Sequence, residues 1–145
     1  MEVSSKAADR VFEKEFARGV VLITEMRFPS GTRRLKYIVV LNDNPADSTT
    51  LLFLTTSQTD YYDRFPHVDH IRIKANTLPF FPKDTILDCR EVFAMEREDL
   101  KRRYREAALR VEGVFPQEYM DQIDKIVAVS RTIAIRYKKQ VLGWV

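Results

Sequence analysis

Residues 33–58 read RRLKYIVVLNDNPADSTTLLFLTTSQ, and this stretch decides the fold. It contains two apolar segments, 35–41 and 49–58, that are rich in β-branched and aromatic residues and are separated by the polar loop 42–48. Such segments are typical of buried strands, and a short loop between them predicts an antiparallel hairpin. In a hairpin, the start of the first strand lies beside the end of the second strand.

The two strand ends that this hairpin brings together carry complementary polar groups. The first strand begins with cations and the second ends with hydroxyl groups and an amide, which are Arg33, Arg34 and Lys36, and Thr55, Thr56, Ser57 and Gln58. A cation fixed beside a hydroxyl donor suits a phosphodiester. We expect Lys36 to supply the cation and Thr56 a hydrogen bond.

Cleavage of RNA through attack by the 2′-hydroxyl is the reaction that this pair fits. The attack builds negative charge on the phosphoryl oxygens, which a fixed cation and hydroxyl donors stabilise without a metal. Lysine has an ordinary pKa of about 10.4, so it is a poor base at neutral pH, and Lys36 is assigned an electrostatic role. A structural interpretation stays open, because threonines often end strands and a lysine often marks where a strand leaves the core.

The composition is that of one ordinary globular domain. The chain has 145 residues, 45% hydrophobic and 31% charged, with no linker or repeat, so a single domain over 1–145 is expected. Its 24 basic and 21 acidic residues give a charge of +3, which permits a nucleic-acid partner without requiring one. A single cysteine, no apolar run of about 18 residues and no apolar leader indicate a soluble cytoplasmic protein with no membrane partner.

The remaining pattern predicts an α+β fold. After Gly19, the apolar run 20–28 reads as a first strand, and two further strands are expected at 70–75 and 85–93. Together with the hairpin they make about five strands, too few for a sandwich, which favours a small β-barrel over approximately 19–95.

Helical periodicity is expected at 6–16 and again beyond residue 95. In the second region, apolar residues recur at three- and four-residue spacing over 100–111, and Gly113 ends the pattern. Another helix is expected over 118–139, with its apolar residues on one face. These segments form a C-terminal helical part over approximately 96–140.

The segments GVVLITEMR, KYIVVLND and LLFLTTSQ resemble the MazF/PemK toxin family of type II toxin–antitoxin systems. The family pattern has a glycine before its first strand, matched by Gly19, and a Thr-x-Gln after its third strand, matched by residues 56–58. It also has an Arg-Pro pair opening the second strand, where this chain has Lys36 and Tyr37. The resemblance covers roughly residues 19–135.

The resemblance implies an SH3-like barrel with C-terminal helices, and a metal-independent endoribonuclease toxin that cleaves single-stranded RNA without a cofactor. A homodimer and a cognate antitoxin protein are implied as partners. In the family, the arginine and the threonine carry the chemistry. The threonine corresponds to Thr56, whereas Lys36 keeps the charge of the arginine and loses its planar fork. A guanidinium from the turn can substitute, so the catalytic candidates are Lys36, Thr56 and Arg34, and the substrate-binding candidates include Arg33, Ser57 and Gln58.

Arg72 and Lys74 complete the substrate-binding candidates. Both lie on one face of the strand expected at 70–75, downstream of the aromatic segment 61–65. Cations that track the backbone and aromatics that stack bases are typical of single-strand binding. A solvated strand face beside a core cluster fits the same pattern, so this assignment stays open.

Three further points bear on function. The segment HVDH (67–70) has two histidines but no cluster that completes a metal site, so a surface loop and no metal are expected. The charged run 96–106 mixes signs, which predicts a solvated helix face with internal ion pairs, or a surface that binds an antitoxin or RNA. Finally, the replacement of the family's arginine by Lys36 favours an alternative function, a non-catalytic SH3-like module that binds RNA or protein.

Overall fold

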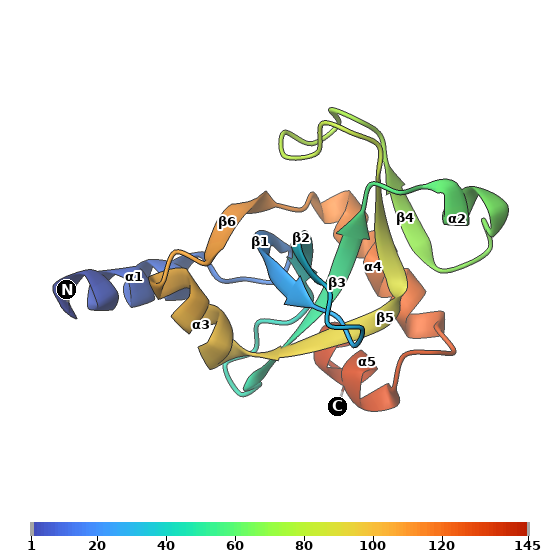
Figure 1. Ribbon diagram of the computed structural model, residues 1–145. Helices are drawn as coiled ribbons and strands as arrows, with labels where there is room; N and C mark the ends of the chain where they lie inside the picture. The colour runs from blue at the N-terminus through green and yellow to red at the C-terminus, as the bar shows by residue number, and fades with distance from the viewer. Residues whose placement is uncertain (1, 145) are drawn as a thin grey trace.

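A computed structural model of the chain describes residues 2–144 and has an α+β fold built on one antiparallel sheet (Figure 1). Six strands lie in the order β4-β5-β3-β2-β1-β6, and the sheet curls into a half-barrel. The strands are β1 (Val20–Arg27), β2 (Arg33–Val40), β3 (Thr49–Thr56), β4 (His70–Ile73), β5 (Thr85–Glu96) and β6 (Leu109–Val114). The α+β class that the sequence predicts is confirmed.

β2 and β3 form the antiparallel hairpin that the sequence predicts. In its register Ile38 pairs with Leu54 and Val40 pairs with Leu52. All positions of β3 between its two end residues are buried, because helices pack on both faces of the sheet. The start of β2 and the end of β3 therefore lie at the same end of the sheet.

The segment 109–114 is a strand, so the helical prediction was wrong there. α3 (Arg97–Arg105) ends early, and Ala107 has a φ of 58°, which turns the chain out of the helical path. β6 then pairs with β1, with Leu109 opposite Thr24, and Leu109 is buried. Hydrogen bonds to the edge of β1 and burial of Leu109 outweigh a helix-like spacing, since propensity yields to tertiary context.

The helix expected over 118–139 is in fact two helices, α4 (Gln117–Val129) and α5 (Ile135–Leu142). The turn between them is held by Ser130, whose hydroxyl accepts hydrogen bonds from the backbone N–H groups of Thr132 and Ile133, both at 3.2 Å. Local side-chain bonds of this kind offer the backbone an alternative to the helix.

Two hydrophobic clusters lie on the two faces of the sheet. α1 (Glu2–Glu15), where a helix was expected, packs with α3 on one face, and α4 and α5 pack on the other face (Figure 1). The short helix α2 (Asp60–Arg64), which was not predicted, follows β3.

Cys89 lies inside the cluster under α4 and α5. It is fully buried, and this burial raises the pKa of its thiol. Among residues 2–144, none of the helices combines the length and apolar character needed to cross a bilayer.

Candidate functional site

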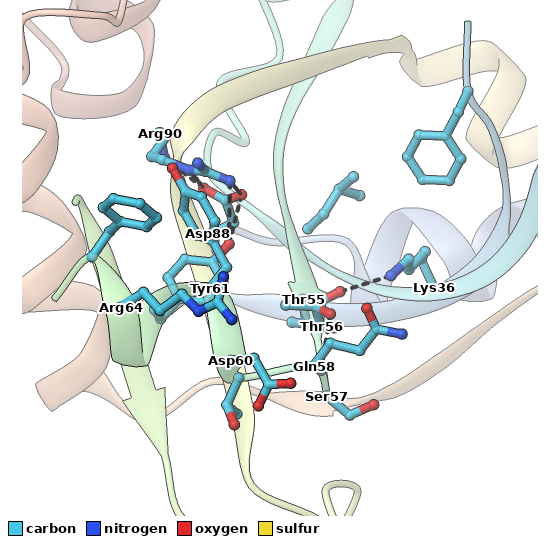
Figure 2. Close-up of a pocket in the computed structure, with 15 residues that line it drawn as sticks. Lys36, Thr55, Thr56, Ser57, Gln58, Asp60, Tyr61, Arg64, Asp88 and Arg90 are labelled. Atoms are coloured by element: carbon cyan, nitrogen blue, oxygen red, sulfur yellow. Dashed lines mark hydrogen bonds and ion pairs between the residues drawn. The ribbon is translucent and has the colours of Figure 1, made fainter. Parts of the chain in front are cut away.

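A cleft opens at the end of the sheet where β2 begins and β3 ends (Figure 2). Its volume is about 960 Å³. It is lined by Phe28, Lys36, Leu54, Thr55, Thr56, Ser57, Gln58, Thr59, Asp60, Tyr61, Tyr62, Arg64, Phe65, Asp88 and Arg90. The cleft therefore gathers four of the eight candidate catalytic and substrate-binding residues, which are Lys36, Thr56, Ser57 and Gln58.

Lys36 lies on β2 in the wall of this cleft. Its Nζ donates a hydrogen bond of 3.4 Å to the carbonyl oxygen of Thr55 on the neighbouring strand (Figure 2). The side chain is half-buried, and this burial, together with the charge of Arg34, lowers the pKa of the Lys36 ammonium. Within the described residues no carboxylate forms an ion pair with Lys36, so its positive charge is not neutralised.

The last residue of β3, Thr56, and the two residues that follow it, Ser57 and Gln58, line the cleft (Figure 2). Thr56 Oγ1 accepts a hydrogen bond of 3.1 Å from the backbone N–H of Gln58, which holds the turn and leaves the hydroxyl proton able to donate. Ile38 pairs with Leu54 in the hairpin, so two residues further along, Lys36 and Thr56 share one face of the sheet.

Across the cleft from Lys36, Asp88 and Arg90 of β5 form an ion pair (Figure 2). The Arg90 guanidinium donates to both carboxylate oxygens of Asp88, at 3.0 and 2.8 Å. The hydroxyl of Tyr62 donates to the same carboxylate at 2.9 Å. Arg90 is therefore committed to a carboxylate, whereas Lys36 is not.

The pKa values of this cluster move away from neutral pH. Burial disfavours the charge on Asp88, but the hydrogen bonds from Arg90 and Tyr62 outweigh it and hold the pKa of Asp88 below its ordinary value. The bonds to Asp88 raise the pKa of Arg90. Burial and the hydrogen bond to Asp88 raise the pKa of Tyr62 to about 12. All three shifts favour the ionised Asp88 and Arg90 and the neutral Tyr62 at neutral pH.

Aromatic side chains of α2 and the residue after it form the next part of the wall. The Arg90 guanidinium lies over the Tyr61 ring, 4.6 Å from its centroid, and the rings of Tyr61 and Phe65 are 5.0 Å apart. Tyr61 and Phe65 are 43% and 44% exposed. Exposed rings beside cations are the usual means of stacking unpaired bases.

Two of the predicted arginines lie beside the cleft rather than in it. Arg34 lines a shallow recess that also includes Lys36, so its charge acts close to the site. Arg33 is on the face of β2 opposite to Lys36, and its guanidinium lies 3.9 Å from the carboxylate of Glu25. The structure thus brings Arg34, and not Arg33, to the side of Lys36.

The predicted pair Arg72 and Lys74 lies apart from the cleft lining. Arg72 forms an ion pair with Asp63 of α2 at 2.7 Å. Lys74 is exposed just after the end of β4. Neither side chain lines the cleft, so the structure does not gather them with Lys36.

Sequence reasoning missed Arg90 and its ion pair with Asp88. The available signal was the spacing Asp-x-Arg on a strand, because residues two apart share a face. The contact with Tyr62 depends on α2, which was not predicted.

The charged run 96–106 is less solvated than the sequence suggested. The internal ion pair between Asp99 and Arg103 is present at 3.3 Å. However, Arg97 and Lys101 pair with Glu13 of α1, at 2.9 and 2.7 Å, so part of this face holds α1 in place.

Within residues 2–144, no group of three or more metal-ligating side chains is arranged to hold an ion, the HVDH segment included. The cleft itself combines Lys36 and the exposed Arg64, neither of which forms an ion pair among the described residues, with one further carboxylate (Asp60), hydroxyl and amide donors and exposed aromatic rings. Cations, hydrogen-bond donors and exposed rings suit an anionic chain with unpaired bases. The chain matches no protein-family model and no curated protein.

Proposed function

We propose that this protein is a metal-independent endoribonuclease that cleaves single-stranded RNA, as a toxin of the MazF/PemK type. The observation that carries the proposal is the Lys36 ammonium beside the end of β3, on the same face as the Thr56 hydroxyl and in the wall of an open cleft. A developing phosphoryl charge needs such a cation and such a donor. The exposed rings of Tyr61 and Phe65 suit the unpaired bases of a single strand.

In the proposed reaction, the 2′-oxygen attacks the adjacent phosphorus, so that the O2′–P bond forms and the P–O5′ bond breaks. The 2′-hydroxyl loses its proton and the departing 5′-oxygen gains one, which gives a 2′,3′-cyclic phosphate and a 5′-hydroxyl. Lys36 stabilises the charge on the phosphoryl oxygens, and Thr56 donates a hydrogen bond to one of them. Ser57 and Gln58 bind the adjoining backbone, and Arg34 adds positive charge beside Lys36.

Further parts of the proposal follow from the resemblance. The curled sheet is proposed to be an SH3-like barrel, and the protein a homodimer with a cognate antitoxin. A small acidic protein encoded beside this one is the antitoxin to test. Co-expression with that protein is expected to suppress RNA cleavage.

Incubation of purified protein with single-stranded RNA in EDTA tests the enzymatic proposal. The expected products carry cyclic-phosphate ends, and Thr56→Ala is expected to abolish them. Thr77→Ala is the matched control, because Thr77 is exposed and lies outside the cleft lining. Cleavage that stops in EDTA contradicts the proposal, as does full activity of Thr56→Ala.

The second candidate is a module that binds RNA or protein without cleaving RNA. It is favoured by Lys36 at the position of the family's arginine, while Arg90, a guanidinium in the same cleft, is committed to Asp88. RNA that is shifted in a gel and stays intact selects this candidate over the enzyme.

A further inference from the structure

A recess lies next to the cleft, on the other side of the start of β2 and the end of β3. It has a volume of about 250 Å³ and is lined by Leu35 and Tyr37 of β2 and by the loop that carries Phe80. Lys36 and Thr56 line both the recess and the cleft. Side chains alternate along a strand, so Leu35 and Tyr37 open onto the face opposite to Lys36.

The ring of Phe80 is a fixed wall of this recess. Its centroid lies 4.8 Å from that of Phe81, in an edge-to-face contact. On β6, Gly113 allows the ring to approach the backbone, because a Cβ at this position would lie 2.7 Å from Phe80 Cε1. Phe80 is half-buried, so part of a positioned ring stays open to solvent.

The rest of the recess combines apolar side chains with hydroxyl groups and two lysines, and no acidic residue lines it. Leu35 is 67% exposed although it is a large apolar side chain. Lys83 lines the recess and Lys36 stands where it meets the cleft, while no Asp or Glu lines it. An apolar surface flanked by cations is complementary to an aromatic group attached to an anion.

We propose that this recess binds one nucleobase of the RNA, on the other side of the bound phosphate from the base at Tyr61. The proposal rests on the proposed function, because the phosphate at Lys36 and Thr56 joins the two bases. The recess is smaller than the roughly 300–1,000 Å³ pockets that enclose drug-sized ligands, which suits a single base. The strand end then separates two base subsites, one on each face of the sheet.

Nucleoside monophosphates distinguish the two subsites. A 3′-monophosphate and a 5′-monophosphate carry the same base and charge, but the base lies on opposite sides of the phosphate. Phe80→Ala is expected to weaken binding of one isomer by roughly 5- to 150-fold and to leave the other unchanged. Tyr61→Ala is expected to do the reverse. A 2′-O-methyl dinucleoside monophosphate, which cannot be cleaved, is expected to bind more weakly to both variants.

Two controls separate failure of the recess from failure of the proposed function. Lys36→Ala is expected to weaken binding of every ligand. Trp144→Ala removes an exposed ring that lines neither the cleft nor the recess, and it is expected to change the binding of none of them. Suppose that Lys36→Ala weakens binding of both isomers, while Phe80→Ala either leaves both affinities unchanged or lowers both equally. The recess proposal is then wrong and the proposed function stands. If Lys36→Ala has no effect and the native protein cuts no RNA, both proposals are wrong. Should Phe80→Ala unfold, Leu35→Ala makes the same test at a 67% exposed position.

Discussion

Lys36 and Arg90 line the same cleft, yet their surroundings have opposite effects on their positive charges. Lys36 donates one hydrogen bond to a backbone carbonyl and is half-buried, and this burial, together with the charge of Arg34, lowers its pKa. Arg90 donates to both oxygens of Asp88, and these bonds raise its pKa. The environment destabilises the charge of Lys36 and stabilises that of Arg90. Of these two cations, the half-buried Lys36, which has no counter-charge, is the one available to an anionic substrate.

The largest expected effect is on catalysis. Lys36→Ala is expected to lower the rate of RNA cleavage roughly 10²–10³-fold, because one electrostatic stabiliser of the developing charge is lost. Single-turnover cleavage of a labelled RNA measures this rate. Lys74→Ala is the matched control, since Lys74 is an exposed lysine outside the cleft lining. A greater loss in Arg90→Ala than in Lys36→Ala would reverse the comparison.

Arg90→Ala is expected to act mainly on stability. It leaves the half-buried Asp88 carboxylate without its bidentate partner, so the free energy of unfolding should fall by about 1–3 kcal/mol. Urea denaturation measures the change. Arg72→Ala breaks the exposed ion pair with Asp63 and should cost only about 0–1 kcal/mol. Equal losses of unfolding free energy in the two variants would show that the Arg90–Asp88 pair stabilises the fold no more than an exposed ion pair does.

The pH dependence of stability tests the same ion pair through its other partner, Asp88. The folded pKa of Asp88 is lowered, so its contribution is present above the unfolded value of about 3.9 and is lost as the pH falls through the folded value. Asp88→Asn is therefore expected to flatten the fall in stability on the acid side of pH 4. Unfolding curves between about pH 2 and 6 measure this, and parallel curves for both proteins would contradict it.

The smallest expected effect is a gain in stability on removing Lys36. Its folded pKa lies below its unfolded value, so the unfolded chain binds more protons between the two, and stability rises with pH in that window. Below both values the ammonium is charged in a disfavoured environment. Lys36→Met is therefore expected to raise Tm slightly at neutral pH. A fall in Tm would show that the hydrogen bond to Thr55 outweighs the burial of the charge.

The hairpin half of the site was predictable because its signal is local. Two apolar runs with polar ends define β2 and β3, and their pairing places Lys36 and Thr56 on one face at the same end of the sheet. The wall opposite was not predictable in this way. The bond between Asp88 and Tyr62 needs α2 to lie over β5, and a register shift between Leu52 and Leu54 displaces the pairing of β5.

β6 shows the same limit in the fold. Its sequence spacing fits a helix, and only the unpaired edge of β1, distant in sequence, gives it a reason to be extended. The same strand supplies Gly113, which no local pattern relates to Phe80. Sequence reasoning therefore missed β6 because its partner lies far along the chain.

The buried position of Cys89 makes the native chain ready for site-specific labelling. A thiol with no exposed surface and a raised pKa resists maleimides while the protein is folded, so it need not be replaced. Ser57 is exposed and lines both the cleft and the recess. A fluorophore on Ser57→Cys would report occupancy of the cleft or the recess. The rate at which Cys89 itself is labelled would measure how often the core opens.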